Sequence, residues 1–225
     1  MRSFNLLLLF VLASPVLAQP ADFDHINLRP AENRARQFQG EELDHLPILV
    51  QNLTATLNTD VERFRAIYLW VCHNIKGDYA MTQMNIRKRK RLQEDGAGLE
   101  VWNSQVRKEI FSILKDRKET LCTGYAFLIQ AMSRLAGIES EIVNGFGRSD
   151  GLKKRPIGMA NHSWNRVRLN GKWYLCDATW SAGYFDETNH LFVFEYDDSY
   201  FLMEPEKFAQ SHYSYSNPDK LATER

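Results

Sequence analysis

The sequence has no excess of charge of either sign, because 28 lysines and arginines are balanced by 28 aspartates and glutamates. No long-range field therefore favours nucleic acid or an anionic membrane as a partner. The one basic run, IRKRKR at residues 86–91, is interpreted as a solvated surface segment, with a patch that docks an acidic partner as the alternative. With 225 residues, 44% of them apolar, the chain can form one good core or at most two small ones.

Cysteine is scarce, with only Cys72, Cys122 and Cys176 in the chain. This count excludes a dense disulfide scaffold, and in an exported protein an odd count leaves at least one thiol without an intramolecular partner. There is no CxxC pair and no Cys/His ligand spacing, which argues against a structural zinc site. We therefore expect no metal and no cofactor. Cys72 lies beside the apolar face of a predicted helix and is expected to be a buried small hydrophobe.

Long hydrophobic runs are also missing, apart from LLLLFVLASPVLA at residues 6–18. This run is too short for a membrane span, follows a positively charged start and ends in small residues, so it predicts a signal peptide cut after Ala18. The mature protein is then expected to be exported, periplasmic or secreted, and to lack a membrane span. Residues 19–42 are interpreted as a loosely packed N-terminal arm, and residues 43–225 as the folded domain.

Hydrophobic periodicity predicts helices first and strands afterwards. Helices are expected over residues 60–75, 101–117 and 120–136, with Asp60 and Thr120 as N-caps and Gly137 as the end of the third. Residues 77–98 are polar and basic and are interpreted as a long loop or lid. Strands are expected at 138–146, 162–169 and 172–180, followed by one more strand and a short helix. This order predicts an α+β fold with an antiparallel sheet.

The Asn170-Gly171 pair between two alternating runs predicts a hairpin with a two-residue type I′ turn. Such a turn sets Leu169 opposite Lys172. Counting back from there, one face of the hairpin should carry His162, Trp164, Asp177 and Thr179, with Trp164 opposite Asp177 and His162 opposite Thr179. Asp177 is then diagonal to His162, about 7–8 Å away, a gap that two side chains can bridge.

A His–Asp pair has a chemical use if a thiol lies near it. A carboxylate fixes the tautomer and orientation of an imidazole, whose second nitrogen can then take a proton from a thiol. Cys122 begins a predicted helix, where free N–H groups and the helix dipole favour a thiolate and can stabilise an oxyanion. The alternatives for Cys122, His162 and Asp177 are core filler, a hydrogen-bonded strand histidine and a turn cap, respectively.

Two longer stretches resemble a known family. LCTGYAFLIQAMSRLAGIESEIVNGFG at residues 121–147 and NHSWNRVRLNGKWYLCDATW at residues 161–180 are similar to the transglutaminase-like superfamily, in particular its bacterial and kyphoscoliosis-peptidase-like branch. That branch runs Cys-x-Gly-Tyr-Ala, His-Ala-Trp-Asn and then Gly-Lys-Trp-Tyr-x-x-Asp-x-Thr-Trp. The likeness extends over about residues 43–213. It implies a transglutaminase-like domain over residues 43–225 with a papain-like core, the nucleophile helix packed on an antiparallel sheet.

The resemblance also implies a catalytic triad of Cys122, His162 and Asp177. The expected function is an exported, cysteine-dependent amide-processing enzyme that works through an acyl-thioester, with peptide or isopeptide hydrolysis favoured. The alternatives are a protein-glutamine acyltransferase that cross-links proteins, and a non-catalytic binding or scaffold module of the same fold. The expected partner is a protein or peptide substrate, with a cell-envelope protein as one option, and the triad chemistry requires no metal.

Several further side chains are candidates for the surroundings of this site. Trp102 and Gln105 are considered as a second side-chain donor to an oxyanion, with packing or a surface position as the alternative. The aromatic residues considered for a cleft, with plain core packing as the alternative, are Tyr125, Trp164, Trp180, Tyr184 and Tyr200.

Overall fold

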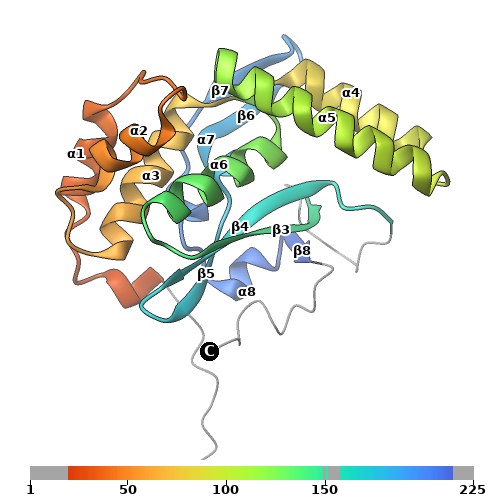
Figure 1. Cartoon of the computed structure of the whole chain (residues 1–225). Helices are drawn as coiled ribbons and strands as arrows, with labels where there is room; N and C mark the ends of the chain where they lie inside the picture. The colour runs from red at the N-terminus through yellow and green to blue at the C-terminus, as the bar shows by residue number, and fades with distance from the viewer. Residues whose placement is uncertain (1–19, 149–150, 152–157, 215–225) are drawn as a thin grey trace, which may run out of the picture.

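The structure is a computed structural model that describes residues 20–148, 151 and 158–214, so the predicted signal peptide lies outside it. Helices and a small sheet pack against each other, with the long helices on one side (Figure 1). The described helices are η1 (Pro20–Phe23), α1 (Arg29–Gln37), α2 (Leu46–Thr54), α3 (Asp60–Asn74), α4 (Tyr79–Arg91), α5 (Gly96–Arg117), α6 (Cys122–Leu135), α7 (Ala178–Ala182), η2 (Asp198–Tyr200) and α8 (Pro205–Phe208). None of these described helices is long and apolar enough to cross a bilayer.

The main sheet has four antiparallel strands in the order β5-β4-β3-β8. Two further pairs of short strands, β1 with β2 and β6 with β7, lie outside it. The strands are β1 (Lys76–Gly77), β2 (Glu119–Thr120), β3 (Ser140–Gly147), β4 (His162–Leu169), β5 (Lys172–Cys176), β6 (Gly183–Asp186), β7 (Leu191–Phe194) and β8 (His212–Ser214). The α+β fold class predicted from the sequence is therefore confirmed.

The β4–β5 hairpin has the predicted register at its turn, where Leu169 pairs with Lys172. Asn170 and Gly171 both have positive φ, as a type I′ turn requires. The ladder ends earlier than predicted, however, at the pair of Asn165 and Cys176.

The expectation that Trp164 faces Asp177 and His162 faces Thr179 across the hairpin is wrong. The reason is local: the carboxylate of Asp177 accepts hydrogen bonds from the backbone N–H groups of Thr179 and Trp180, so the chain turns into α7 instead of continuing the strand.

Two helices form the centre of the core. α3 is buried along most of its length, and α6 packs against α3 on one side and β4 on the other. α3 begins with a reciprocal capping box between Thr59 and Glu62, so Thr59 is the N-cap in place of the expected Asp60. α6 covers the predicted range and ends before Gly137, whose φ is +77°. Leu121 occupies its N-cap position without a side-chain cap, and Thr120 lies in β2.

Two segments expected to be irregular are helices. The N-terminal arm contains α1, which is packed on α3 with Ala31 and Ala35 buried, so it is not loose. Residues 77–98, expected to be a loop or lid, contain α4, which Asp78 caps through the N–H of Met81. The small apolar stripe that holds α4 on α5 was obscured by the polar and basic residues around it; it consists of Met81, Val106, Ile110 and Leu121.

A buried tyrosine on α3 holds the short helix α7, which follows Asp177. The hydroxyl of Tyr68 lies 2.7 Å from Ser181 Oγ and donates to the carbonyl oxygen of Tyr200 at 3.1 Å. Ser181 in turn donates to the carbonyl oxygen of Asp197. α7 is thus bonded both to the central helix and to the segment that leads to η2.

Removing this hydroxyl should destabilise the protein. Tyr68→Phe leaves buried oxygens without their partner, which is expected to lower the free energy of unfolding by about 1–2 kcal/mol. Tyr184→Phe is the matched control, because the Tyr184 ring is 51% exposed, and it should change stability by less than about 0.5 kcal/mol. Urea unfolding of the two variants measures the difference, and equal stabilities would contradict this role for Tyr68.

Candidate active site

Cys122 is the first residue of α6 and the only one of the three cysteines that is not fully buried. Leu121 before it has extended backbone, so the chain enters the helix at the thiol. The first N–H groups of a helix have no partner within it and carry the positive end of the helix dipole. All three thiols are free, and burial raises the pKa of both Cys72 and Cys176. Of the three thiols, Cys122 is therefore the candidate for chemistry.

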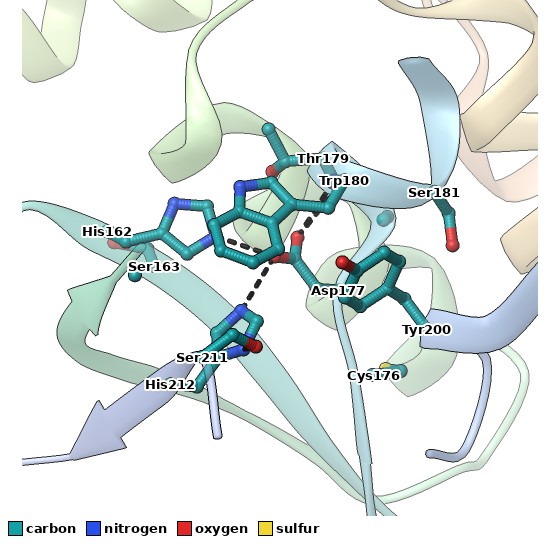
Figure 2. A network of polar contacts seen from close by, with 12 residues as sticks. His162, Ser163, Cys176, Asp177, Thr179, Trp180, Ser181, Tyr200, Ser211 and His212 are labelled. Atoms are coloured by element: carbon teal, nitrogen blue, oxygen red, sulfur yellow. Dashed lines mark hydrogen bonds and ion pairs between the residues drawn. The ribbon is translucent and has the colours of Figure 1, made fainter. Parts of the chain in front are cut away.

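Asp177 holds the centre of the site. Its side chain is fully buried and lies at the N-cap of α7. Oδ1 accepts the N–H groups of Thr179 at 2.9 Å and Trp180 at 3.2 Å. Oδ2 lies 2.6 Å from Nε2 of His162 and 3.1 Å from Nε2 of His212, so two imidazoles converge on one carboxylate oxygen (Figure 2).

His162 connects this carboxylate to the thiol. It begins β4, paired with Gly145 of β3, and its ring stacks on Trp180 with 5.2 Å between centroids. Because Nε2 is directed at Asp177, Nδ1 is the nitrogen left for Cys122. Burial alone would lower the pKa of His162, but the adjacent charge of Asp177, its hydrogen bond and the bond to Cys122 outweigh burial and raise the pKa to about 10.

The pKa of Cys122 moves in the opposite direction. Burial would raise it, but the hydrogen bond from His162, the charge of that imidazole and the backbone N–H of Ser163 outweigh burial and lower the pKa. A lowered thiol pKa beside an imidazole whose pKa is raised favours a thiolate–imidazolium pair at neutral pH. A thiolate–imidazolium pair supplies a nucleophile and a proton donor in one site.

His212 is a member of the site that sequence reasoning missed. It lies on β8, its ring stacks on Phe208 at 3.9 Å, and Nδ1 is 2.8 Å from Ser211 Oγ. Burial lowers its pKa, and the opposing contacts with Asp177 do not reverse this, so the ring is neutral near pH 7. A neutral His212 donates from Nε2 to Asp177 and accepts from Ser211. The only sequence signal for it is a histidine in the last residues of the family likeness, which extends to about residue 213.

His162, Asp177 and His212 are also residue types that bind transition metals, and their ligand atoms lie within 4.8 Å of one another. Both ring nitrogens lie at hydrogen-bond distances from the same oxygen, Asp177 Oδ2. These are the contacts of a hydrogen-bond network, and a metal among the three would have to separate the rings from the carboxylate.

A family model matches the part of the chain that carries this site. The sequence model described as "Transglutaminase-like superfamily" matches residues 48–178, which include Cys122, His162 and Asp177. The chain belongs to the transglutaminase-like superfamily. This match confirms the family inferred from the sequence.

Individual relatives match mainly over this domain. The chain is 35% identical to human kyphoscoliosis peptidase over 167 residues, covering 73% of this chain and 22% of the relative. It is 24% identical to Hillarin of Drosophila melanogaster over 211 residues, covering 88% of this chain and 23% of the relative. The chain thus spans under a quarter of the length of these relatives. A solved structure described as "Crystal structure of a TGase" is 14% identical, with a TM-score of 0.40, covering 66% of this chain and 32% of that one.

Two hollows reach the thiol of this transglutaminase-like domain, and both are lined by Cys122, Asn161 and His162. The larger, about 900 Å³, lies toward the β6–β7 pair, and its aromatic lining includes Tyr125, Trp180, Tyr184, Phe185 and Tyr200. The smaller, about 500 Å³, lies toward α4 and α5. The Cys122–His162 pair therefore lies where the two hollows meet.

The other candidate residues are distributed unevenly around the pair. Tyr125 and Trp180 line the larger hollow, although Tyr125 also donates to the carbonyl oxygen of Ile75 as a core residue would. Trp164 is buried against the edge of His212 and lines neither hollow. Trp102 donates its Nε1–H to Asn85, and Gln105 is exposed on α5.

Neither Trp102 nor Gln105 lines the hollows at Cys122. The structure therefore gives neither of them a contact with the place where an oxyanion would form.

Removing the imidazole of His212 should change the pKa of His162. His212→Phe keeps a ring but removes the donor to Asp177, so the carboxylate becomes a stronger partner for His162, whose pKa should rise by about one unit. Titration of ¹⁵N-labelled histidines by NMR measures this shift. His212→Gln, which retains an N–H, should restore most of the wild-type value. An unchanged His162 pKa in His212→Phe would contradict the contact's electrostatic role.

Proposed function

We propose that this chain is a cysteine-dependent amide-processing enzyme in which Cys122 is the nucleophile, His162 the acid and base, and Asp177 the group that orients His162. The observation that carries the proposal is the buried 2.6 Å contact of His162 with Asp177, on a ring that lines the same two hollows as Cys122. Membership of the transglutaminase-like superfamily supports the same roles.

The first half-reaction begins with attack of the Cys122 thiolate on the carbonyl carbon of an amide. A C–S bond forms and the carbonyl oxygen becomes an oxyanion, which the free N–H groups at the start of α6 can stabilise. When the oxyanion collapses, the C–N bond breaks, and the His162 imidazolium gives its proton to the departing amine. A thioester on Cys122 and a neutral His162 remain.

The second half-reaction releases the acyl group. Neutral His162 takes a proton from water as the water oxygen attacks the thioester carbon, and the C–S bond breaks to give a carboxylic acid. The thiolate and the imidazolium are restored. Asp177 keeps its charge throughout, since burial is outweighed by the two imidazoles and its pKa is held well below its usual range.

Hydrolysis of peptide or isopeptide bonds is the reaction we favour over acyl transfer. The human relative at 35% identity is named a peptidase. Hollows on two sides of Cys122 suit a polypeptide that passes across the thiol, with the acyl part on one side and the leaving amine on the other. The leader-like residues 1–18 support a site of action outside the cytoplasm.

The test is cleavage of a defined protein mixture. Unfolded casein is incubated with the wild-type protein or with Cys122→Ala, with and without a primary amine such as glycine ethyl ester, and the products are identified by mass spectrometry. The wild type should produce new free carboxyl ends, and Cys122→Ala should lose at least about a thousandfold in rate.

Two outcomes would overturn this proposal. Products that carry the amine with no free acid would make the protein an acyltransferase. Equal product formation by the wild type and Cys122→Ala, or none by either together with no covalent labelling of Cys122 by a peptidyl electrophile, would favour the non-catalytic module.

A further inference from the structure

The basic run of the sequence lies at the candidate active site. Residues 86–91 form the end of α4, and Arg89 and Lys90 line the smaller hollow together with Arg107 of α5. This is the hollow of about 500 Å³ that reaches Cys122 and His162. α4 and α5 lie side by side (Figure 1). Both helices therefore contribute cations to the lining of this hollow.

The described lining of this hollow offers these cations no carboxylate as a partner. Among the residues that the structure describes around this hollow, none is an aspartate or a glutamate. Lys90 and Arg107 are exposed and have no ion pair within the described chain. Arg89 is half-buried and donates to the carbonyl oxygen of Ala160 at 3.0 Å, which fixes its guanidinium beside the strand that carries His162.

The larger hollow is lined mainly by acidic residues. Glu187, Glu195, Asp197 and Asp198 line it, and Arg148 is its one lining lysine or arginine among the described residues. Although Asp198 is paired with Arg65, the charged side chains that line the two hollows are thus basic on one side of the Cys122–His162 pair and mainly acidic on the other. Such a surface can set the direction in which a polypeptide binds, because each hollow repels side chains of its own charge and attracts side chains of the opposite charge.

We propose that the smaller hollow, hereafter the basic subsite, binds aspartate or glutamate side chains of the substrate polypeptide next to the bond that is processed. This deepens the proposed function and rests on it, since it takes the substrate to be a polypeptide lying across Cys122. Lys90 and Arg107 are the specificity residues, and each can form a charge-assisted hydrogen bond with a carboxylate. Arg89, already bonded to Ala160, adds positive charge at the wall.

The first experiment measures binding, so that it does not depend on turnover. A fluorescent deca-glutamate peptide is titrated into the wild-type protein, into Lys90→Gln/Arg107→Gln and into Arg91→Gln/Lys108→Gln. The last variant is the matched control: it removes the same two charges from the same helices, from exposed neighbours that do not line the subsite. Relative to the wild type, Lys90→Gln/Arg107→Gln should bind the deca-glutamate peptide roughly tenfold more weakly, and the control variant less than about twofold more weakly.

The second experiment measures selectivity in turnover. A library of peptides derived from a proteome is incubated with the same three proteins, and the sequences around the processed bonds are compared. Aspartate and glutamate should be enriched on one side of the bond in the wild type and in the control, and the enrichment should disappear in Lys90→Gln/Arg107→Gln.

The outcomes separate this inference from the function on which it rests. Equal weakening by the two double variants, or processed bonds with no preference for acidic neighbours, would overturn the basic subsite and leave the enzyme proposal intact. Selective binding of deca-glutamate with no processing by any variant would support the subsite as an acidic-segment binder and count against the enzyme.

Discussion

The site is organised by one buried negative charge, the carboxylate of Asp177. A fully buried carboxylate is unfavourable unless hydrogen bonds and opposite charge compensate its lost hydration. Four donors do so here: two backbone N–H groups at the start of α7 and one nitrogen from each of two histidines. Because these donors come from β4, α7 and β8, a correctly placed Asp177 requires that all three elements be in place.

This arrangement makes two similar side chains behave differently. His162 and His212 both contact Oδ2 of Asp177, yet the pKa of one is raised to about 10 and that of the other is lowered. One carboxylate can compensate only one imidazolium fully, and a second positive charge so close would be repelled. His162 lies closer to the carboxylate oxygen, at 2.6 Å against 3.1 Å for His212, and it also interacts with Cys122, a partner that can itself become negative.

Local patterns in the sequence identified much of this site because its parts depend on short-range rules. The Asn170-Gly171 turn fixed the register near Leu169, and Gly137 correctly marked the end of α6. The pairing of His162 with Asp177 was anticipated although the assumed route was wrong, since Asp177 caps a helix rather than continuing a strand.

The missing parts depend on tertiary contacts. His212 reaches Asp177 only because β8 pairs with β3, a contact between segments that are about 65 residues apart and carry no local signal. α4 has a weak apolar face, so its helical state rests on a cap at Asp78 and on packing against α5. The basic residues of this helix could be located at the thiol only once that packing was known.

The most direct test of the central claim is the pH dependence of Cys122 alkylation, comparing the wild type with the isosteric variant Asp177→Asn. Iodoacetamide labelling followed by intact mass reports Cys122 alone in the folded protein, because Cys72 and Cys176 are fully buried. The wild type should already react rapidly below pH 7, because the pKa of Cys122 is lowered, and Asp177→Asn should react appreciably only as the pH approaches 8–9, as an ordinary thiol does. The same late rise in both proteins would contradict a thiolate that the buried carboxylate stabilises through His162.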